Sequence, residues 1–268
     1  MKDYRARFLF KSLAALERLV RRLRFLIYEK HRFVIAMTDR PKNNYTDVML
    51  ARIKDLTKNK IASDLISPAI YEFDYDRKLF LSYCCSYLGN NPKNYRILDI
   101  GGGFGQQAHY VSRVLKFRCD VIEQDQLVAE IRQGGFDKLL GVRFLTYDEF
   151  IYGKRRHDSQ AYQLVIFQGS LSYIQNPIDY LEAIIRKSHC KFLAISRFPV
   201  SDNLTDAILV YDNFGGHQEF IFPKGEIQKW ASKYSVRFLE YSSLVRSKAN
   251  INDIKVDSLN LVIEIGDV

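Results

Sequence analysis

Cysteine is scarce in this sequence of 268 residues, and its few cysteines follow no metal-binding pattern. The four cysteines, Cys84, Cys85, Cys119 and Cys190, form no CxxC motif and have no histidine at a ligand spacing. We therefore expect no zinc site and no metal of another kind. We also expect no disulfide framework, because a chain of this length can bury a full hydrophobic core without one.

Long apolar runs are missing as well. The longest uncharged stretch, residues 159–178, contains Gln, Asn, Ser, Gly and Pro, so it is typical of a strand and a loop and not of a membrane span. Arginines interrupt the apolar residues of the N-terminal region, which argues against a signal peptide. We therefore expect a cytoplasmic protein, with peripheral attachment to the inner membrane as an open alternative.

Positive charge is present but is unevenly distributed. Residues 1–32 contain ten Lys or Arg against three Asp or Glu, which accounts for +7 of the net +9. The rest of the chain is close to neutral. A basic groove across the whole fold, as nucleic-acid binding would require, is therefore not favoured.

Apolar residues in the N-terminal region recur at steps of three and four, from Leu9 to Ile27. This period predicts a basic amphipathic helix, and further helical pattern follows at residues 46–58. We assign residues 1–60 to an N-terminal helical segment and residues 61–268 to the main domain. The helix could pack on the main domain or a second subunit, lie on an anionic membrane surface through residues 5–28, or contact nucleic acid, which we favour least.

From residue 95 onwards short apolar strands alternate with helices, which predicts an α/β fold with a mostly parallel, seven-stranded Rossmann-like sheet. The last two strands are separated by a long loop, so we expect an antiparallel pair at one edge of the sheet. Strands are expected at residues 96–100, 119–123, 142–145, 162–167, 191–196, 236–241 and 259–265. Helices are expected at residues 106–116, 126–133, 178–187 and 224–233.

The strongest local signal is a glycine-rich turn after the first of these strands. The run Arg-Ile-Leu-Asp-Ile-Gly-Gly-Gly-Phe-Gly at residues 96–105 ends an apolar strand and leads directly into a helix. Glycines at such a turn permit positive φ angles and let backbone amides approach a ligand. The free N–H groups at the N-terminus of the helix favour an anionic group such as a carboxylate.

The spacing of this turn separates two kinds of nucleotide site. The dinucleotide pattern GxGxxG would need a third glycine where this chain has Gln106. The observed spacing is D-x-G-x-G-x-G, and it resembles motif I of class I methyltransferases that depend on S-adenosylmethionine (SAM). The resemblance implies that SAM is the cofactor and that its methionine part faces this turn. The residues implied are Asp99, Gly101, Gly102, Gly103 and Gly105.

Acidic and polar residues at the ends of the next strands agree with a nucleoside ligand. Glu123 ends the second strand 18 residues after Gly105, where a carboxylate can accept hydrogen bonds from both ribose hydroxyls. We expect the next residue, Gln124, to contact the cofactor as well. By the same resemblance Asp148 lies near the adenine. The residues Gln168, Gly169 and Ser170 after the fourth strand are expected to border the cofactor.

Four runs in order narrow the resemblance further. They are residues 98–105, 121–125, 169–177 and 194–199, and together they resemble bacterial methyltransferases associated with the synthesis of cell-surface polysaccharides. The likeness covers residues 74–244 and implies O-methylation of a sugar hydroxyl in a glycan or its precursor. Methylation of a small metabolite and a catalytically silent scaffold with this fold are the alternatives. We leave the oligomeric state open.

The acceptor is expected over the fourth and fifth strands, beside an aromatic segment at residues 211–222. Aromatic rings there suit stacking on a sugar, and His217 has the chemistry of a general base, with Asp202, Asp212 and Glu219 as competitors. We expect Tyr173, Arg197 and Tyr211 to contact the acceptor. Neither a [D/N]PPY motif after the fourth strand nor a G-x-S-x-G motif is present, which disfavours methylation of nucleic-acid bases and hydrolase chemistry.

Overall fold

The computed structural model describes residues 33–35, 75–88, 95–153, 161–212, 217–242 and 254–266. The helix expected between Leu9 and Ile27, the helical pattern at 46–58 and the proposed domain boundary at residue 60 all lie outside this part of the chain. In the part that is described, no helix is long and apolar enough to cross a membrane.

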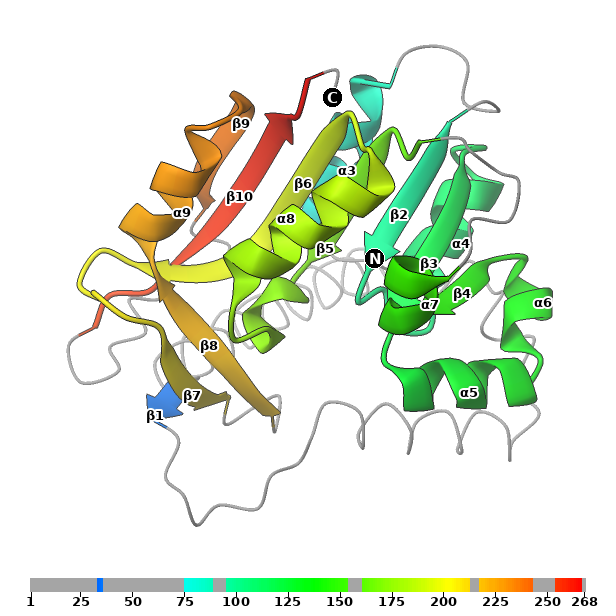
Figure 1. Ribbon diagram of the computed structural model, residues 1–268, viewed down its shortest axis with the longest axis horizontal. Coiled ribbons are helices and arrows are strands. Elements are labelled where there is room, and N and C mark those ends of the chain that lie inside the picture. The colour runs from blue at the N-terminus through cyan, green and yellow to red at the C-terminus, as the bar shows by residue number, and fades with distance from the viewer. Residues whose placement is uncertain are drawn as a thin grey trace, which may run out of the picture.

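Five parallel strands form the centre of the sheet (Figure 1). Their order across the sheet is β4-β3-β2-β5-β6, and every neighbouring pair is parallel. The order reverses between β2 and β5, which makes the carboxyl ends of these two strands the usual ligand position in such sheets. The five strands are β2 (Arg96–Ile100), β3 (Arg118–Glu123), β4 (Arg143–Thr146), β5 (Leu164–Gln168) and β6 (Phe192–Ser201).

Two antiparallel strands complete the expected seven. β10 (Asp257–Glu264) lies between β6 and β9 (Ser235–Ser242) and is antiparallel to both. The predicted fold class and its antiparallel ending are confirmed. The strand boundaries differ from the expected ones by at most two residues, apart from the end of β6.

Three further strands, which the sequence analysis did not predict, extend the sheet to ten strands. β6 runs on to Ser201, five residues past its expected end, and its last residues pair with β8 (His217–Pro223). β8 forms an antiparallel hairpin with β7 (Ile208–Asp212), and β1 (Phe33–Ile35) pairs with β7. The expected acceptor segment is therefore largely a hairpin built onto the end of β6.

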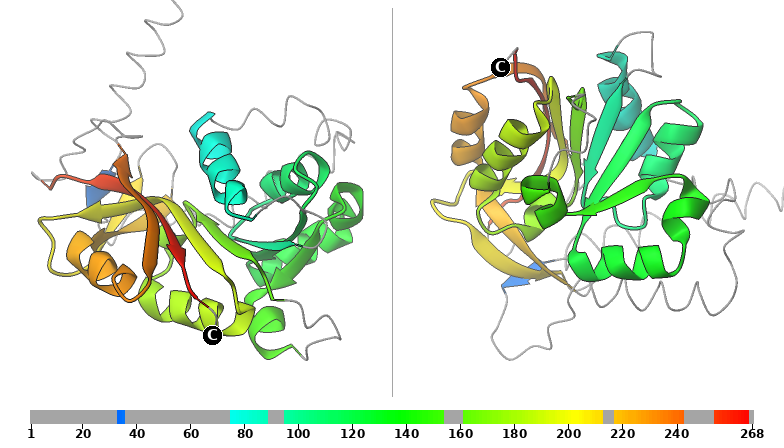
Figure 2. Two further views of the ribbon diagram at one scale, coloured as in Figure 1. Left: turned by 90° about the horizontal axis from the view of Figure 1, so that it is seen from above. Right: turned by 45° about the vertical axis from the view of Figure 1, so that its right-hand side comes forward.

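Helices cover both faces of the sheet, as Figures 1 and 2 show. α3 (Tyr75–Ser86), α4 (Gln106–Arg113), α5 (Asp125–Gln133) and α6 (Phe136–Leu140) lie on one face. α7 (Tyr147–Tyr152), α8 (Pro177–Ser188) and α9 (Lys224–Ala231) lie on the other. α3, α6, α7 and the short 3₁₀ helix η4 (Leu171–Tyr173) were not predicted. α4 ends three residues before its expected end.

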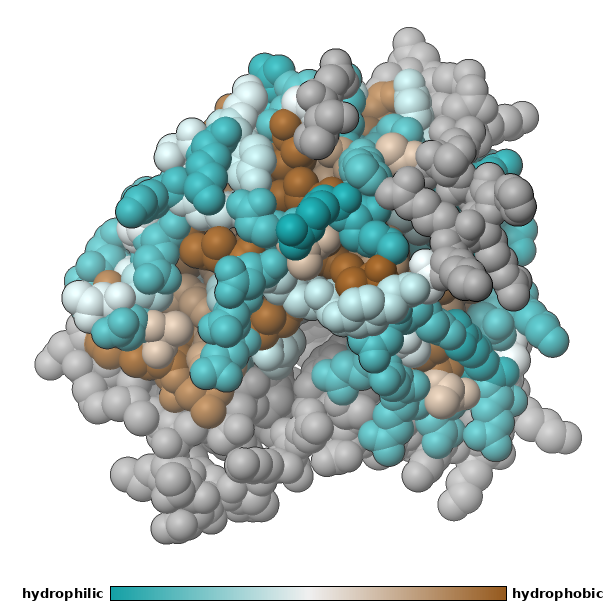
Figure 3. Space-filling model, in the orientation of Figure 1, coloured by the Kyte–Doolittle hydropathy of each residue, from teal (hydrophilic) through white to brown (hydrophobic). Residues whose placement is uncertain are grey.

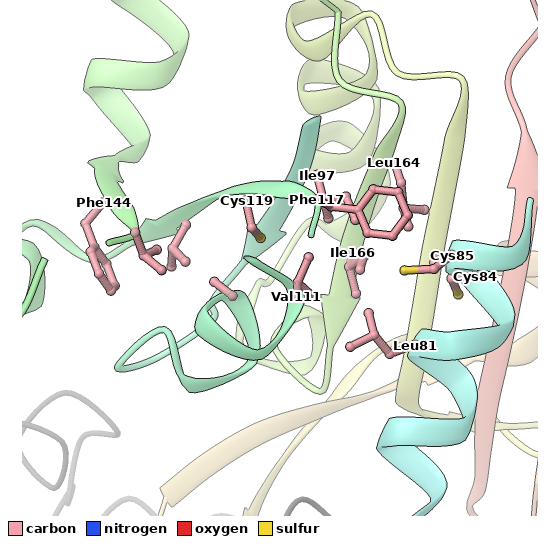
Figure 4. Close-up of a cluster of buried hydrophobic side chains, with 14 of the residues drawn as sticks. Leu81, Cys84, Cys85, Ile97, Val111, Phe117, Cys119, Phe144, Leu164 and Ile166 are labelled. Carbon is pink, nitrogen blue, oxygen red and sulfur yellow. The ribbon is translucent and has the colours of Figure 1, made fainter. Parts of the chain in front are cut away.

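The strands divide their side chains between the two faces with a period of two. In β5, Leu164 and Ile166 enter the core beneath α3–α6, whereas Val165 and Phe167 enter the core beneath α7–α9. Figure 4 shows the first core, where Cys84 and Cys85 of α3 pack near the strands. All four cysteines are buried and free, and burial raises the pKa of the Cys85 thiol to about 12. These thiols act as small apolar packing groups.

Candidate functional site

The glycine turn joins β2 to α4 at the carboxyl edge of the sheet. Gly101, Gly103 and Gly105 have φ angles of 70°, 58° and 73°, in the left-handed region that other residues rarely adopt. The Gly101 N–H donates to the carbonyl oxygen of Ile122 at 2.8 Å, which holds the start of the turn against β3. The predicted strand–turn–helix unit is therefore present.

Close packing fixes this turn as firmly as its backbone angles do. A Cβ atom built on Gly101 would lie 2.3 Å from Cβ of Ser170, and one built on Gly105 would lie 2.5 Å from Cζ of Phe144. Gly102 has no positive φ, but a Cβ there would lie 2.6 Å from Oδ2 of Asp99. No side chain larger than hydrogen fits at these positions without movement of a neighbour.

Asp99 lies beneath the turn. Its side chain is 2% exposed, and the approach to Gly102 shows that it supports the turn from below. Above it, α4 begins at Gln106 directly after Gly105, which as a glycine has no side chain to cap this helix end. The first amides of α4 have no partner within the helix, so they can donate to a ligand at the carboxyl edge.

Glu123 links the end of β3 to the same turn. Its Oε1 accepts the Gly103 N–H at 2.8 Å, and its Oε2 accepts the Gln124 N–H at 3.0 Å. The side chain is 5% exposed, and this burial raises the pKa of Glu123, against the lowering effect of the two backbone hydrogen bonds. The sequence predicted that both features belong to one site, and the structure brings them into direct contact.

The carboxylate of Glu123 also retains acceptor capacity. A carboxylate has about four lone-pair directions, and two backbone donors use only part of them. Within the described ranges no Lys or Arg forms a salt bridge with Glu123. A ligand that offers two adjacent hydroxyl donors can therefore use the acceptor capacity that remains on this acid. In the same ranges no three His, Cys, Asp or Glu side chains are grouped as metal ligands.

The residues after β5 border the turn. Ser170 donates from Oγ to the carbonyl oxygen of Ile100, at the last residue of β2. Gly169 has a φ of 76°, and its N–H donates to the carbonyl oxygen of Ser196 at 2.9 Å. Gln168 is half-buried at the end of β5. The residues expected on either side of the cofactor are thus neighbours at the point where the strand order reverses.

Two other expected cofactor residues lie at helix starts on the same edge. Gln124 is exposed and precedes α5. Asp148 is exposed in the first turn of α7, next to a capping box in which Thr146 Oγ1 accepts the Glu149 N–H at 3.0 Å. An acid in the first turn of a helix is also favoured by the helix dipole, so the position of Asp148 has a purely structural explanation as well.

The expected acceptor residues are spread over three elements. Tyr173 lies in η4, which is next to β8, and Arg197 lies within β6. Tyr211 lies in β7 and His217 begins β8, where the backbone pairs His217 with Asp212. The side chains of Tyr211, Asp212 and His217 are outside the described part of the structure.

The other two competing bases have separate surroundings. Glu219 is buried in β8 opposite Val210. Asp202 accepts a hydrogen bond from Lys224 Nζ at 3.0 Å. Asp202 is therefore held in a surface ion pair.

Tyr180 is a half-buried residue near Glu123 that the sequence analysis did not single out. It lies on α8, stacks on Tyr147 with ring centroids 5.0 Å apart, and meets the edge of Phe167 at 6.1 Å. Burial raises its pKa above the ordinary value, and the nearby charges of Tyr147 and Glu123 add to this effect. No local pattern marked Tyr180, because it occupies an ordinary position in an amphipathic helix.

Comparison with known proteins gives structural neighbours only. No protein-family model matches the sequence, and no curated protein matches it. The N-terminal domain of EvdMO1, crystallised in the presence of SAH and D-fucose, has a TM-score of 0.49 and 13% identity, over 79% of this chain and 96% of that one. A SAM-dependent methyltransferase from Clostridium acetobutylicum has a TM-score of 0.46 and 13% identity, over 78% of this chain and 99% of that one.

A third neighbour is an O-methyltransferase family protein from Burkholderia thailandensis. Its TM-score is 0.45 and its identity 12%, over 83% of this chain and 61% of that one. Identities this low describe similarity of fold and not of activity. What the protein does must therefore be inferred from its own residues.

The candidate cofactor residues lie together along the carboxyl edge of the sheet. The glycine turn, Glu123 and the Gly169–Ser170 segment are joined by backbone and side-chain hydrogen bonds at the carboxyl ends of β2, β3 and β5. In the space-filling view the surface is hollowed between the part of the molecule that carries β8 and the part that carries α5 (Figure 3). This arrangement can hold an extended ligand that has both an anionic group and a ribose.

Proposed function

We propose that this protein is a SAM-dependent methyltransferase whose cofactor binds across the carboxyl ends of β2, β3 and β5. The observation that carries the proposal is the hydrogen bond from the Gly103 N–H to Glu123 Oε1, 2.8 Å long. It joins a turn suited to an anionic group and an acid suited to a ribose into one site.

The residues of this site divide the binding between them. The turn at residues 101–105 and the free amides of α4 suit the carboxylate of the methionine part. Glu123 accepts hydrogen bonds from the ribose hydroxyls in this proposal. Asp148, Gln124 and the Gln168–Ser170 segment border the rest of the cofactor. When bound, SAM supplies a methyl group on a positively charged sulfur, so the protein has to orient the acceptor and take up a proton.

The acceptor that we propose is a hydroxyl of a surface glycan or of its precursor. The position of η4 and the β7–β8 hairpin beside the end of β6 supports an acceptor site over β5 and β6. In this proposal Tyr173, Arg197 and Tyr211 hold the acceptor, and His217 removes the hydroxyl proton. The basic segment at residues 5–28 would dock the enzyme on the cytoplasmic surface of the inner membrane or on a partner protein.

Calorimetric titration with S-adenosylhomocysteine tests the cofactor site. We expect the wild-type protein to bind it, and Glu123→Ala to weaken binding by about ten- to a hundredfold, the loss expected for hydrogen bonds to a charged group. Glu226→Gln is the matched control, since Glu226 is exposed in the first turn of α9. Absence of binding to the wild-type protein at millimolar ligand would reject the proposal in favour of a silent scaffold.

Mass analysis of products tests the acceptor class. We expect the addition of one methyl group to cell-envelope glycans or their precursors after incubation with SAM. His217→Ala should lower the rate without changing the affinity for S-adenosylhomocysteine. Methylation of small metabolites alone would reject the glycan acceptor and leave the methyltransferase function in place.

A further inference from the structure

Three residues other than glycine have positive φ angles in the described part of the chain, and one of them differs from the rest. Lys116 follows α4, where the Phe117 N–H donates to the carbonyl oxygen of Val111 at 3.2 Å. His189 ends α8 in the same left-handed conformation. A left-handed residue just after a helix is common, so both positive φ angles are explained by the helix ends. Arg197, with a φ of 58°, lies inside strand β6, where no helix end explains it.

A β-bulge accounts for the backbone of Arg197. Ile195 pairs with Leu261 and Phe198 pairs with Leu259, so Ser196 and Arg197 together face Asn260 alone. Asn260 is 4% exposed, and its Oδ1 accepts the Arg197 N–H at 3.1 Å. Bulges of this kind bend a strand and change the direction of a side chain. A buried side chain from the neighbouring strand thus stabilises the unusual conformation.

The bulge lies beside the proposed cofactor site. The Gly169 N–H donates to the carbonyl oxygen of Ser196 at 2.9 Å, and a Cβ built on Gly169 would lie 3.9 Å from Cβ of Arg197. Gly169 leads into Ser170, which packs on Gly101 of the turn. Arg197 therefore lies near the carboxyl end of β5. It stands between the glycine turn and the β7–β8 hairpin, which pairs with the end of β6.

Among the residues that the structure describes, no acidic side chain pairs with Arg197, which is half-buried. Arg96, Arg132, Arg143 and Arg237 all have such partners. Glycine would adopt this backbone conformation without strain, so the backbone alone does not explain an arginine at this position.

We propose that Arg197 is a specificity residue that binds an anionic group of the methyl acceptor, a carboxylate or a phosphate. This proposal rests on the methyltransferase function proposed above and narrows its substrate class to acidic or phosphorylated sugars. The planar guanidinium can form two parallel hydrogen bonds with either group, which fixes the orientation of the acceptor as well as its affinity.

The test measures binding to the full-length protein loaded with S-adenosylhomocysteine. The probes are D-glucuronate, D-glucose 1-phosphate and D-glucose, so that the carboxylate and the phosphate are compared separately with a neutral sugar. We expect at least one anionic probe to bind about tenfold or more tightly than glucose, as charge-assisted hydrogen bonds imply. The probe with the larger preference identifies the anion.

Substitutions at Arg197 then separate its side chain from its backbone. Arg197→Gly should abolish the preference while leaving the melting temperature unchanged or higher, because glycine relieves the positive φ. Arg197→Lys should retain part of the preference. Lys116→Gly is the matched control, because it removes a basic side chain at a φ of 64° on the opposite edge of the sheet, and it should keep the full preference.

Three results would overturn the proposal. The first is equal binding of all three probes to the wild-type protein, and the second is a preference that survives in Arg197→Gly. The third is weaker binding of S-adenosylhomocysteine to Arg197→Gly, which would mean that Arg197 contacts the carboxylate of the cofactor. Failure of the wild-type protein to bind S-adenosylhomocysteine is a separate result, and it rejects the methyltransferase function itself.

Discussion

The two edges of the central sheet both bury an acidic side chain, but they satisfy it in different ways. Near the amino edge, Oδ2 of Asp120 accepts hydrogen bonds from Arg96 Nη2 at 2.7 Å and from Tyr162 Oη at 2.6 Å. Arg143 forms a further salt bridge with the same oxygen. The partners of Asp120 in this cluster are all protein side chains. We call Asp120, Arg96, Arg143 and Tyr162 the closed cluster, because they satisfy one another without a ligand.

At the carboxyl edge, Glu123 is equally buried but accepts only backbone N–H groups among the described residues. Burial raises the pKa of Glu123, and the two backbone hydrogen bonds partly oppose this effect. The contrast shows that burial of an acid alone does not mark a binding site. The proposed cofactor site rests on more than burial, because Glu123 also contacts the glycine turn and keeps unused acceptor capacity.

Removal of the closed cluster should have the largest effect on stability. Asp120→Ala leaves Arg96 buried without its carboxylate, so we expect the free energy of unfolding to fall by roughly 3–5 kcal/mol. Urea denaturation measures this loss. The folded protein should still bind S-adenosylhomocysteine with wild-type affinity, and a large loss of affinity would contradict the separation of the two edges.

A side chain in the glycine turn should have the next largest effect. Gly105→Ala adds a Cβ that would lie 2.5 Å from the ring of Phe144, at a φ of 73°. We expect it to cost about 1–3 kcal/mol of unfolding free energy and to weaken binding of S-adenosylhomocysteine at least about tenfold. Denaturation and calorimetry measure the two losses.

The chain offers a matched control for this substitution. Gly135 has a φ of 70° and open space around a Cβ, so Gly135→Ala tests the backbone strain alone. It should cost about 1 kcal/mol and leave ligand binding unchanged. Equal losses in the two variants would show that packing against Phe144 has no part in fixing the turn.

The smallest effect concerns pH. Because the pKa of Glu123 is raised above its ordinary value of 4.5, the folded state holds the proton more tightly than the unfolded state does. The stability that Glu123 contributes is complete below 4.5 and is lost as the pH rises through the raised pKa. Denaturation of wild type and Glu123→Gln across this range should show the slope in the wild type only.

Ligand binding should change with pH in the opposite direction. The ionised carboxylate is the better acceptor for ribose hydroxyls, so the affinity for S-adenosylhomocysteine should rise with pH through the same window. Calorimetry at several pH values measures it. An affinity that falls as Glu123 ionises would argue against a ribose at this position.

The parts of the fold that were predictable are those with a strong local pattern. The five parallel strands are short apolar runs between helices, and the glycine turn is a local requirement of the backbone. α6 and α7 were missed because five or six residues give too short a period to detect. The β7–β8 hairpin was missed because residues 211–222 were judged by their aromatic side chains as an acceptor segment, and no strands were assigned there.

The candidate site was predictable to the same degree. Gly101, Gly105 and Glu123 were found because their spacing along the chain follows from the strand–turn–helix unit. Tyr180 was not singled out, since its place near Glu123 depends on the packing of α8 over β5. The N-terminal helix and the side chains of Tyr211 and His217 stay predictions, because they lie outside the described residues.

The sequence by itself determined the strand–turn–helix unit at residues 96–113, because backbone angles and apolar period act between near neighbours. Only the tertiary structure decided which groups meet. The parallel pairing of β2 with β3 carries Glu123 to Gly103, and Asn260, 63 residues further along the chain, holds the backbone of Arg197. Contacts between residues so distant in sequence depend on which strands become neighbours in the sheet, and the pattern within one segment does not name its partner strand.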